Sequence, residues 1–290
     1  MEYPVQYLAG IDRAPIHWPD GARIAVNLVV NIEYFEPGVP ATSINPGFAG
    51  FVPDVYNHSW RDYGVRSGLW RLARVLDRHG ITATVALNAL VCRHYPRVIQ
   101  ELVRRRWEIM GHGLTNSQIL TKLAPEAEKQ VIAETLDMIE AATGTRPEGW
   151  LSPALAESWE TPRLLEEAGV RYVCDWLNDD EPYLMDTPNG TLLSMPYSGE
   201  INDIHCFLRA GYDGPRYLQL LKDQFDVLYE EGERSGTVMT IPLHPFIVGH
   251  PFRAKYLDMA LDHMRGRPDV WFATGGQVAQ AYLAGRDAAA

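Results

Sequence analysis

The sequence predicts an α/β protein built as a barrel of parallel strands, each followed by a helix. Short apolar runs alternate with amphipathic stretches, no Gly-, Pro- and Ser-rich linker divides them, and no Gly-rich phosphate loop follows the first strand. The alternation of roughly seven strands with helices predicts a parallel sheet covered by helices. The undivided pattern favours one barrel domain over residues 1–290. The missing phosphate loop disfavours the alternative, a doubly wound open sheet.

The expected elements follow from composition and periodicity. Apolar, β-branched runs predict strands at 23–31, 82–87, 107–111, 148–152, 171–176, 191–197, 237–244 and 270–274. Apolar residues at helical spacing, with stop signals such as Gly80 and Gly144, predict helices at 62–79, 95–106, 124–144, 161–168, 214–234, 253–265 and 275–284. The segment 35–61 is rich in Gly, Pro and aromatic residues and is too long for an ordinary connection. We expect a lid or an oligomer contact there.

Composition and charge narrow the function classes. The chain has 290 residues, of which 46% are hydrophobic and 22% charged, and these values are typical of a globular protein. A net charge of -11 argues against nucleic-acid binding, which needs a clustered basic face. The cysteines Cys92, Cys174 and Cys206 form no CxxC pair, so neither a zinc knuckle nor a disulfide framework is indicated. Without a signal-peptide pattern or a run of about 20 apolar residues, we expect a cytoplasmic protein with no membrane partner.

Polar side chains gather where the expected strands end. The first strand ends near Asn31 and Glu33, and the third ends at His112 with Asn116 beyond it. The other strand ends provide Trp150, Ser152, Asp175, Asp179, Asp180, Asn202, Asp203 and His244. Because the carboxyl ends of the strands meet at one face of a parallel barrel, chemistry is expected there. A carboxylate can take a proton from water and a histidine can protonate a leaving nitrogen, so the set favours acid–base hydrolysis.

Each of these residues also has an ordinary structural explanation when taken alone. His112 can be a core histidine bonded to backbone, His244 can shape a turn between two prolines, and Glu33 can face solvent. Their joint placement at strand ends favours function. No Gly-x-Ser-x-Gly elbow is present and Cys174 lies in an apolar run, so a serine or cysteine nucleophile is disfavoured.

Several motifs resemble the polysaccharide deacetylase (NodB-homology) superfamily of carbohydrate esterases. They are NIEYFEPG (31–38), YGVRSGLWRL (63–72), EIMGHG (108–113), GW (149–150), NDDEPY (178–183), PYSGEIND (196–203), FDVLYEEGE (225–233) and LHPFIVGHPFR (243–253). The resemblance runs over nearly the entire chain. Within the superfamily the chain looks most like the branch of cofactor-independent allantoinases and related cyclic amide or imide hydrolases. The resemblance implies a distorted (β/α)7-type barrel.

The metal site of the resembled family is altered in this chain. Metal-dependent members hold a divalent ion with one Asp and two His, and the two histidines are four residues apart. His112 matches the first histidine, while Asn116 stands at the second. Depending on register, the ligand aspartate falls on Glu33 or Tyr34 and the catalytic-base aspartate on Asn31 or Glu33. Catalytic zinc normally needs three protein ligands, and an amide oxygen is a poor substitute. We therefore expect no metal cofactor, with a divalent metal such as zinc as the alternative.

Together these observations predict a hydrolase that opens a small cyclic amide, imide or ureide by attack of water at a ring carbonyl. Glu33 is the expected general base, His112 binds the water or polarises the carbonyl, and His244 protonates the departing nitrogen, as the family's last LH motif implies. The residues expected to bind the substrate are Arg66, Asn116, Trp150, Ser152, Asp175, Asn202 and Asp203. Two alternatives are a metal-dependent deacetylase of an N-acetyl sugar or peptidoglycan fragment, and an inactive homologue that binds a ligand. The resemblance also implies a homodimer or homotetramer.

Overall fold

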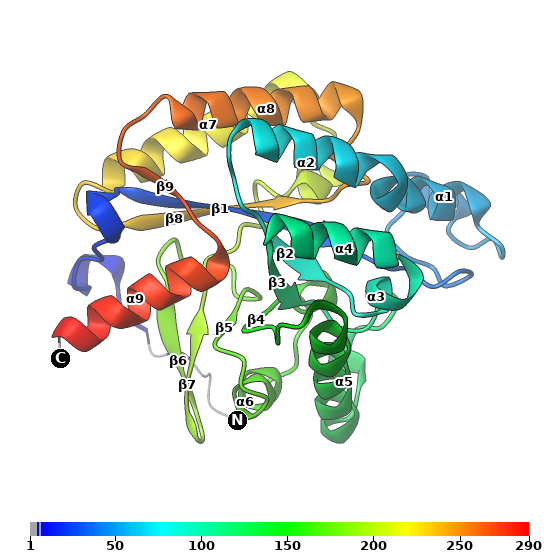
Figure 1. The fold of residues 1–290 in the computed structure, drawn as a ribbon, viewed down its shortest axis with the longest axis horizontal. Helices are drawn as coiled ribbons and strands as arrows, with labels where there is room; N and C mark the ends of the chain where they lie inside the picture. The colour runs from blue at the N-terminus through cyan, green and yellow to red at the C-terminus, as the bar shows by residue number, and fades with distance from the viewer. Residues whose placement is uncertain (1–4, 6, 290) are drawn as a thin grey trace.

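The computed structural model describes residue 5 and residues 7–289, and its centre is a curled, mostly parallel sheet (Figure 1). Its strands follow the order β6-β7-β5-β4-β3-β2-β1-β8. The sheet curls without closing, because β6 and β8 are the two ends of this hydrogen-bonded path. With helices around it, the sheet forms a half-barrel, and the predicted fold class is confirmed.

β1 (Ile24–Ile32) is the central strand. It pairs in parallel with β8 (Thr237–Leu243), with β2 (Thr84–Leu87) near its carboxyl end and with β9 (Val270–Phe272) near its amino end. The remaining strands are β3 (Glu108–Gly111), β4 (Gly149–Trp150), β5 (Tyr172–Val173), β6 (Tyr183–Thr187) and β7 (Gly190–Ser194). β6 and β7 form an antiparallel hairpin. β6 was not predicted from the sequence, because only Met185 in this strand is buried and no apolar run marks it.

Both faces of β1 are buried, and its side chains alternate between two cores. Ile24, Val26, Leu28, Val30 and Ile32 join the core under the helices. Ala25 and Val29 belong to the second core on the other face. Side chains in a strand point alternately to opposite faces. Glu33 follows β1 directly and lies an even number of residues after Ala25 and Val29. Its position in the alternation therefore directs its side chain to the same face of the sheet as theirs.

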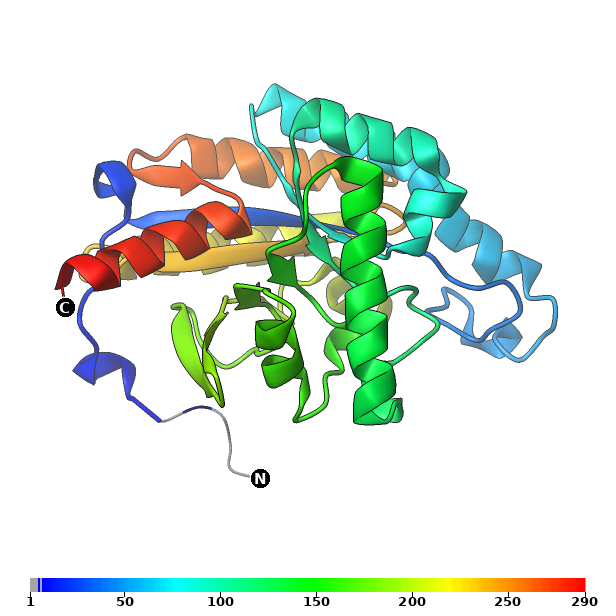
Figure 2. The ribbon, with the colours of Figure 1, turned by 60° about the horizontal axis from the view of Figure 1, so that its bottom comes forward.

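The helices cover the outside of the sheet. They are α1 (Val55–Tyr63), α2 (Leu69–Arg78), α3 (Leu90–His94), α4 (Pro96–Arg105), α5 (Pro125–Thr143), α6 (Thr161–Glu167), α7 (Gly214–Glu231), α8 (Pro251–Arg265) and α9 (Gly275–Ala289). α2, α7 and α8 lie together over β1 and β8 (Figure 1), and the β6–β7 hairpin lies away from them (Figure 2). In the described part of the chain, none of the helices has the length and apolar character that a bilayer crossing needs.

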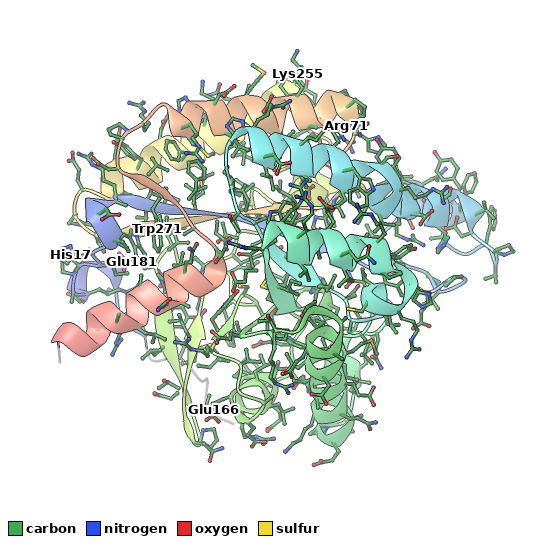
Figure 3. All side chains as sticks on the ribbon, in the orientation of Figure 1. His17, Arg71, Glu166, Glu181, Lys255 and Trp271 are labelled. Atoms are coloured by element: carbon green, nitrogen blue, oxygen red, sulfur yellow. The ribbon has the colours of Figure 1, made fainter. Side chains whose placement is uncertain are left out.

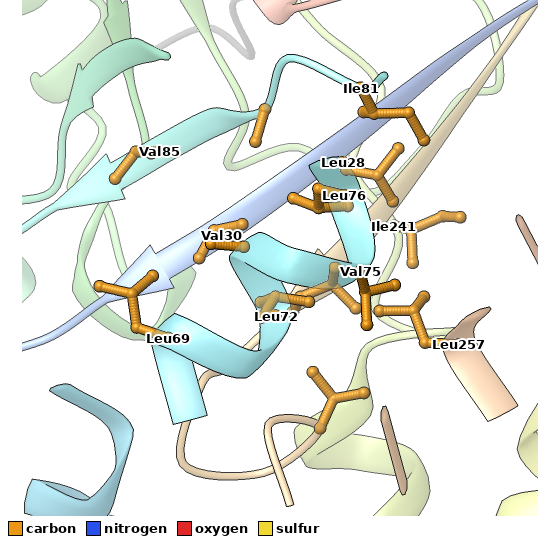
Figure 4. Close-up of a cluster of buried hydrophobic side chains, with 14 of the residues drawn as sticks. Leu28, Val30, Leu69, Leu72, Val75, Leu76, Ile81, Val85, Ile241 and Leu257 are labelled. Atoms are coloured by element: carbon orange, nitrogen blue, oxygen red, sulfur yellow. The ribbon is translucent and has the colours of Figure 1, made fainter. Parts of the chain in front are cut away.

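The core under α2 explains why this helix forms where the apolar spacing predicted it. Leu69, Leu72, Val75 and Leu76 of α2 pack against Leu28 and Val30 of β1, Ile241 of β8 and Leu257 of α8 (Figure 4). Each fully buried aliphatic side chain of this kind contributes about 1.5–3 kcal/mol relative to leaving it exposed. The buried face of this amphipathic helix therefore packs α2 against β1, the strand that Glu33 follows.

The segment 35–61 is only partly irregular. Its end is helical from Val55, because Asp54 caps α1 by accepting a hydrogen bond from the backbone N–H of Asn57 at 3.1 Å. The predicted helix start at 62 is therefore late. The apolar spacing failed here because Val55 and Tyr56 are exposed on the surface rather than buried. The role of this segment as a lid or an oligomer contact stays a prediction, as does the single-domain assignment.

Two glycines fix the loop that follows β8 against the start of α2. A Cβ at Gly68 would lie 1.9 Å from the carbonyl oxygen of Pro245, and a Cβ at Gly249 would lie 2.1 Å from the same oxygen. Arg71 of α2 (Figure 3) strengthens this contact, since its Nη1 donates to the carbonyl of Gly249 and, at 2.7 Å, to the hydroxyl of Tyr63. The position of His244 therefore depends on close backbone packing.

Gly68→Ala is expected to lower the free energy of unfolding by about 1–3 kcal/mol, because the added methyl group must displace backbone atoms of Pro245. Denaturant unfolding measures the change. Gly285→Ala in α9 is the matched control, since its Cβ would meet nothing within 4 Å. An unfolding free energy for Gly68→Ala no lower than that of the control would contradict this packing argument.

Candidate active site

Three strand ends bring one carboxylate and two histidines together. Glu33 follows β1, His112 follows β3 and His244 follows β8. Glu33 Oε1 lies 3.6 Å from His112 Nε2 and 3.5 Å from His244 Nε2. The side chains are only 4%, 2% and 5% exposed, respectively. The three residues predicted to be catalytic are therefore neighbours in a buried site.

Asp203 fixes the orientation and the charge of His244. Nδ1–H of His244 donates to Asp203 Oδ1 at 2.6 Å, and Asp203 Oδ2 accepts the backbone N–H of His244 at 2.7 Å. Burial lowers the pKa of His244, but the charges of Asp203 and Glu33 outweigh it and raise this pKa to about 10. His244 is therefore an imidazolium near neutral pH, and its Nε2 faces Glu33.

Glu33 is an anion with one occupied oxygen and one without a partner. Burial raises the pKa of Glu33, but the charge of His244 and the proximity of His112 outweigh it and lower this pKa to about 2. Oε1 accepts a hydrogen bond from Asn116 Nδ2 at 2.5 Å. Oε2 is buried and has no hydrogen-bond partner among the described residues. A buried carboxylate oxygen without a partner can accept a hydrogen bond from a water molecule or a ligand.

His112 also presents one nitrogen to the site. Its Nδ1–H donates to the backbone carbonyl of Leu151 at 2.6 Å. This bond leaves Nε2, which is buried and has no hydrogen-bond partner among the described residues, on the side of Glu33. His112 can therefore contact a water molecule or a carbonyl oxygen through Nε2.

A chain of hydrogen bonds that runs through Asn88 fixes the orientation of the Asn116 side-chain amide. The backbone N–H of Tyr34 donates to Asn88 Oδ1 at 2.8 Å, so Asn88 must present its Nδ2 on the other side. Asn88 Nδ2 donates to Asn116 Oδ1 at 3.1 Å and also to the carbonyl of His112. Because a backbone N–H can only donate, the orientation of each amide follows from the one before it. Asn116 consequently presents its NH₂ group, not its oxygen, to Glu33.

These residues do not fit the divalent metal of the resembled family. A catalytic zinc site needs three protein ligands with lone pairs aimed at one point. The amide of Asn116 aims a donor at Glu33, and its oxygen is taken by Asn88. Within residues 5 and 7–289, no three His, Cys, Asp or Glu side chains are grouped as a metal site requires. The expectation of no metal cofactor stays a prediction.

One hydrogen-bonded group lies beside His112 and consists of Trp150, Ser152 and Asp175. Trp150 Nε1 donates to Ser152 Oγ at 3.0 Å, and Asp175 Oδ1 accepts the backbone N–H of Ser152 at 2.7 Å. Burial and the charge of Asp175 raise the pKa of the neighbouring Glu157 to about 10. Glu157 was not predicted from the sequence.

The remaining predicted substrate-binding residues lie elsewhere. Asp203 is fully buried behind His244, so it positions this histidine rather than facing a ligand. Asn202 Oδ1 accepts the backbone N–H of Ile204 at 2.9 Å. Arg66 lies on the π-helical turn Gly64–Gly68, where its side chain is 74% exposed and pairs with Asp62 at 3.5 Å. The structure therefore does not bring Arg66 to the site.

A small cavity of about 20 Å³ opens beside Glu33. It is lined by Glu33, Tyr34, Phe35, His58, Arg61, Asp62, Val65 and Tyr95. A volume of this size is close to what one water molecule requires. Three residues near this cavity were not predicted from the sequence, namely His58, Arg61 and Asn88. Asn88 follows β2 directly, so the strand-end rule applied to that strand would have found it, whereas His58 and Arg61 carry no periodic signal.

The chain is similar to known proteins over nearly its whole length. The family model described as polysaccharide deacetylase matches residues 59–173. A crystal structure described as a probable polysaccharide deacetylase from Pseudomonas aeruginosa PAO1 is 30% identical, with 97% of this chain and 98% of that chain covered and a TM-score of 0.86. The crystal structure of the allantoinase Puue is 28% identical, with 98% of each chain covered and a TM-score of 0.86.

A Schizosaccharomyces pombe (strain 972 / ATCC 24843) protein, whose name also refers to a polysaccharide deacetylase, is 28% identical over 97% of this chain and 98% of its own length. The likeness to these three proteins extends over nearly the whole chain, whereas the family match includes His112 but neither Glu33 nor His244. With its curled parallel sheet and its buried site at the strand ends, the chain belongs to the polysaccharide deacetylase (NodB-homology) family.

Proposed function

We propose that this protein is a hydrolase that opens a small cyclic amide, imide or ureide at a ring C–N bond, with water as the nucleophile and without a metal. One observation carries the proposal. Glu33 is an anion and His244 a cation at neutral pH, and they face each other across 3.5 Å. A base and an acid are therefore present together in the protonation states that amide hydrolysis requires.

In the first step, Glu33 Oε2 removes a proton from a water molecule in the cavity, while His112 Nε2 helps to hold that water. The water oxygen bonds to the ring carbonyl carbon, and the π-electron pair of the carbonyl moves onto its oxygen. The low pKa of Glu33 makes it a weak base at rest. The cation that lowers this pKa is His244, which loses its charge only when it donates its proton in the next step.

In the second step, the oxyanion re-forms a C=O bond and the C–N bond breaks. The nitrogen keeps the electron pair of that bond and takes the proton from His244 Nε2. The released group is a carboxylic acid, which ionises to a carboxylate. The proton on Glu33 then returns to His244 over the 3.5 Å that separates their side chains, and the resting charges are restored.

The allantoinase among the structural neighbours supports a cyclic ureide or a related ring as the substrate class. The donor set supports chemistry without zinc, since Asn116 turns an N–H group toward the site. The alternative function, a metal-dependent deacetylase, is supported by the family name and by the Pseudomonas aeruginosa structure. One experiment separates these two activities.

Purified protein is expected to open at least one ring among allantoin, hydantoin and succinimide, and to retain this activity after exhaustive chelation. Metal analysis of the same sample provides the control. Chelator-sensitive acetate release from N-acetylglucosamine oligomers, restored by zinc, would establish the deacetylase instead. Tight binding of one of these compounds with no turnover of any would indicate the inactive homologue.

A further inference from the structure

Arg61, in α1, carries a buried guanidinium group whose hydrogen bonds are incomplete. The residue is 7% exposed. Its Nη1 donates to the backbone carbonyl of Thr42 at 2.7 Å, but its Nε is buried and has no hydrogen-bond partner in the described part of the chain. A guanidinium group stays charged and offers five N–H donors, so burying it with unmet donors is costly. This cost indicates that Arg61 serves a ligand.

Three of the four carboxylate oxygens of Asp54 and Glu33 have hydrogen-bond partners, and Glu33 Oε2 has none among the described residues. Asp54 accepts hydrogen bonds from Asn57 through both of its oxygens, at 3.1 Å and 2.7 Å. Glu33 directs its Oε1 to Asn116 and the two histidines. The other close contact of the guanidinium is the ring of Phe35, whose centroid lies 4.9 Å from Cζ. A ligand oxygen that carries negative charge would complete this environment.

Three residues that carry a buried atom without a partner line the same cavity. Arg61, His58 and Glu33 all line it. Arg61 Nε, His58 Nδ1 and Glu33 Oε2 are each buried without a hydrogen-bond partner among residues 5 and 7–289. The carboxylate oxygen is an acceptor for a water proton, and the guanidinium is a donor for an oxygen. The arrangement places an oxyanion-binding group beside the proposed position of the attacking water.

We propose that Arg61, with His58 as a second donor, binds the carbonyl oxygen of the amide bond that is hydrolysed, and then the carboxylate that contains this oxygen. The inference rests on the proposed hydrolysis of a cyclic amide. When the water oxygen bonds to the carbonyl carbon, the displaced π-electron pair collects on this oxygen, and Arg61 neutralises it. Donors aimed at developing charge in a buried site accelerate the reaction because they need no reorganisation.

The segment 35–61 positions Arg61 for this role. Asn57 fixes the turn before α1, since its Oδ1 accepts the backbone N–H of Asn45 at 3.0 Å and its Nδ2 donates to the Asn45 carbonyl at 3.0 Å. That turn lies three residues beyond Thr42, whose carbonyl holds Arg61 Nη1. The long segment therefore supplies a catalytic residue, and this function is distinct from a lid or an oligomer contact.

Two substitutions of Arg61 test the proposal. Arg61→Gln is expected to lower kcat for ring opening by about 10²–10³-fold, the loss typical of one oxyanion donor. Arg61→Lys keeps the charge but loses the Nε donor, and a smaller loss is expected. Arg104→Gln is the matched control, because this arginine is 64% exposed and pairs with Glu101, which does not line the cavity, and its kcat is expected to equal that of the wild type. Wild-type kcat in Arg61→Gln would overturn the proposal.

Inhibitor binding distinguishes a catalytic role from a structural one. Succinamate mimics a ring-opened product with a carboxylate, and succinamide is its neutral isostere. Arg61→Gln is expected to weaken succinamate binding by about 10–100-fold, as loss of charge-assisted hydrogen bonds would, and to leave succinamide binding unchanged. Equal weakening of both compounds would show a merely structural role and overturn the proposal. If Arg61→Gln does not fold, the same comparison is made with Arg61→Lys.

The result is separable from the proposed function. Calorimetric binding of succinamate does not require turnover. A wild-type protein that opens no ring but binds succinamate through Arg61 would refute the hydrolase and retain the anion-binding group. A wild-type protein that opens rings but loses neither kcat nor succinamate affinity in Arg61→Gln would retain the hydrolase and refute the role of Arg61.

Discussion

Glu33→Gln is expected to lower kcat for ring opening by about 10²–10⁴-fold, the range that loss of a proton-transfer residue produces. Glutamine has the size of glutamate, so the buried neighbours keep their packing, but its amide cannot take a proton from water. It also removes the negative charge that faces the imidazolium of His244 at 3.5 Å. Steady-state kinetics on the preferred ring substrate measures the loss.

Glu36→Gln is the matched control for this change. Glu36 is three residues further along the same segment and its side chain is exposed. The control is expected to retain wild-type kcat. Full turnover by Glu33→Gln would remove Glu33 from the proposed mechanism and leave His112 as the nearest candidate base.

Asp203→Asn is expected to shift the alkaline limit of activity to lower pH. His244 acts as a proton donor, so the rate holds only while this residue is protonated. In the wild type its pKa is about 10, because the charges of Asp203 and Glu33 outweigh the effect of burial. Activity should therefore persist from neutral pH to about pH 10 and fall above it. Without the charge of Asp203, His244 loses its proton at lower pH.

Asp203→Asn is expected to lower activity for two reasons, because it removes the charge beside His244 and because it no longer fixes the orientation of that ring. An asparagine cannot fix the Nδ1–H tautomer as a carboxylate does, and the same change in the Ser-His-Asp triad costs about 10⁴-fold in kcat. A pH–rate profile with limits unchanged in Asp203→Asn would contradict the assignment of His244 as the acid. Asp179→Asn serves as the control, because this carboxylate is paired with Arg13 at 2.6 Å, away from the histidines.

The raised pKa of His244 and the lowered pKa of Glu33 also make the free energy of unfolding depend on pH. The pKa of His244 is raised, so its contribution to folding is complete below the unfolded pKa of about 6.5 and disappears as pH rises through about 10. The pKa of Glu33 is lowered, so its contribution is complete above about 4.5 and disappears as pH falls through about 2. The two contributions therefore coexist across the neutral range.

The sequence predicted the parts of this molecule that depend on local pattern. The apolar run of β1 is buried along its entire length, and the amphipathic spacing of α2 matches the core in which it packs. Glu33, His112 and His244 were found because parallel strands end at one edge, whatever the distances between them in sequence. The strand ends and the direction of the sheet bring these positions together, and the family resemblance singled them out as catalytic.

The parts that were missed depend on tertiary contacts. Arg61 lies on a helix whose Val55 and Tyr56 are exposed, so no buried stripe marked that helix or its inward residue. β6 is held by pairing with β7 rather than by its own apolar content. The distinction between Asp203 as a ligand contact and Asp203 as the partner of His244 needed the 2.6 Å bond between them.

The chain of amides has a consequence for how this site changes in evolution. It begins at the backbone N–H of Tyr34, a group that only a substitution by proline removes, and it passes through Asn88 to Asn116. A histidine at 116 alone would take away the oxygen that Asn88 Nδ2 now reaches, so the two positions are epistatic. A mutational path from this arrangement to a three-ligand site therefore passes through a less stable intermediate, unless positions 88 and 116 change together.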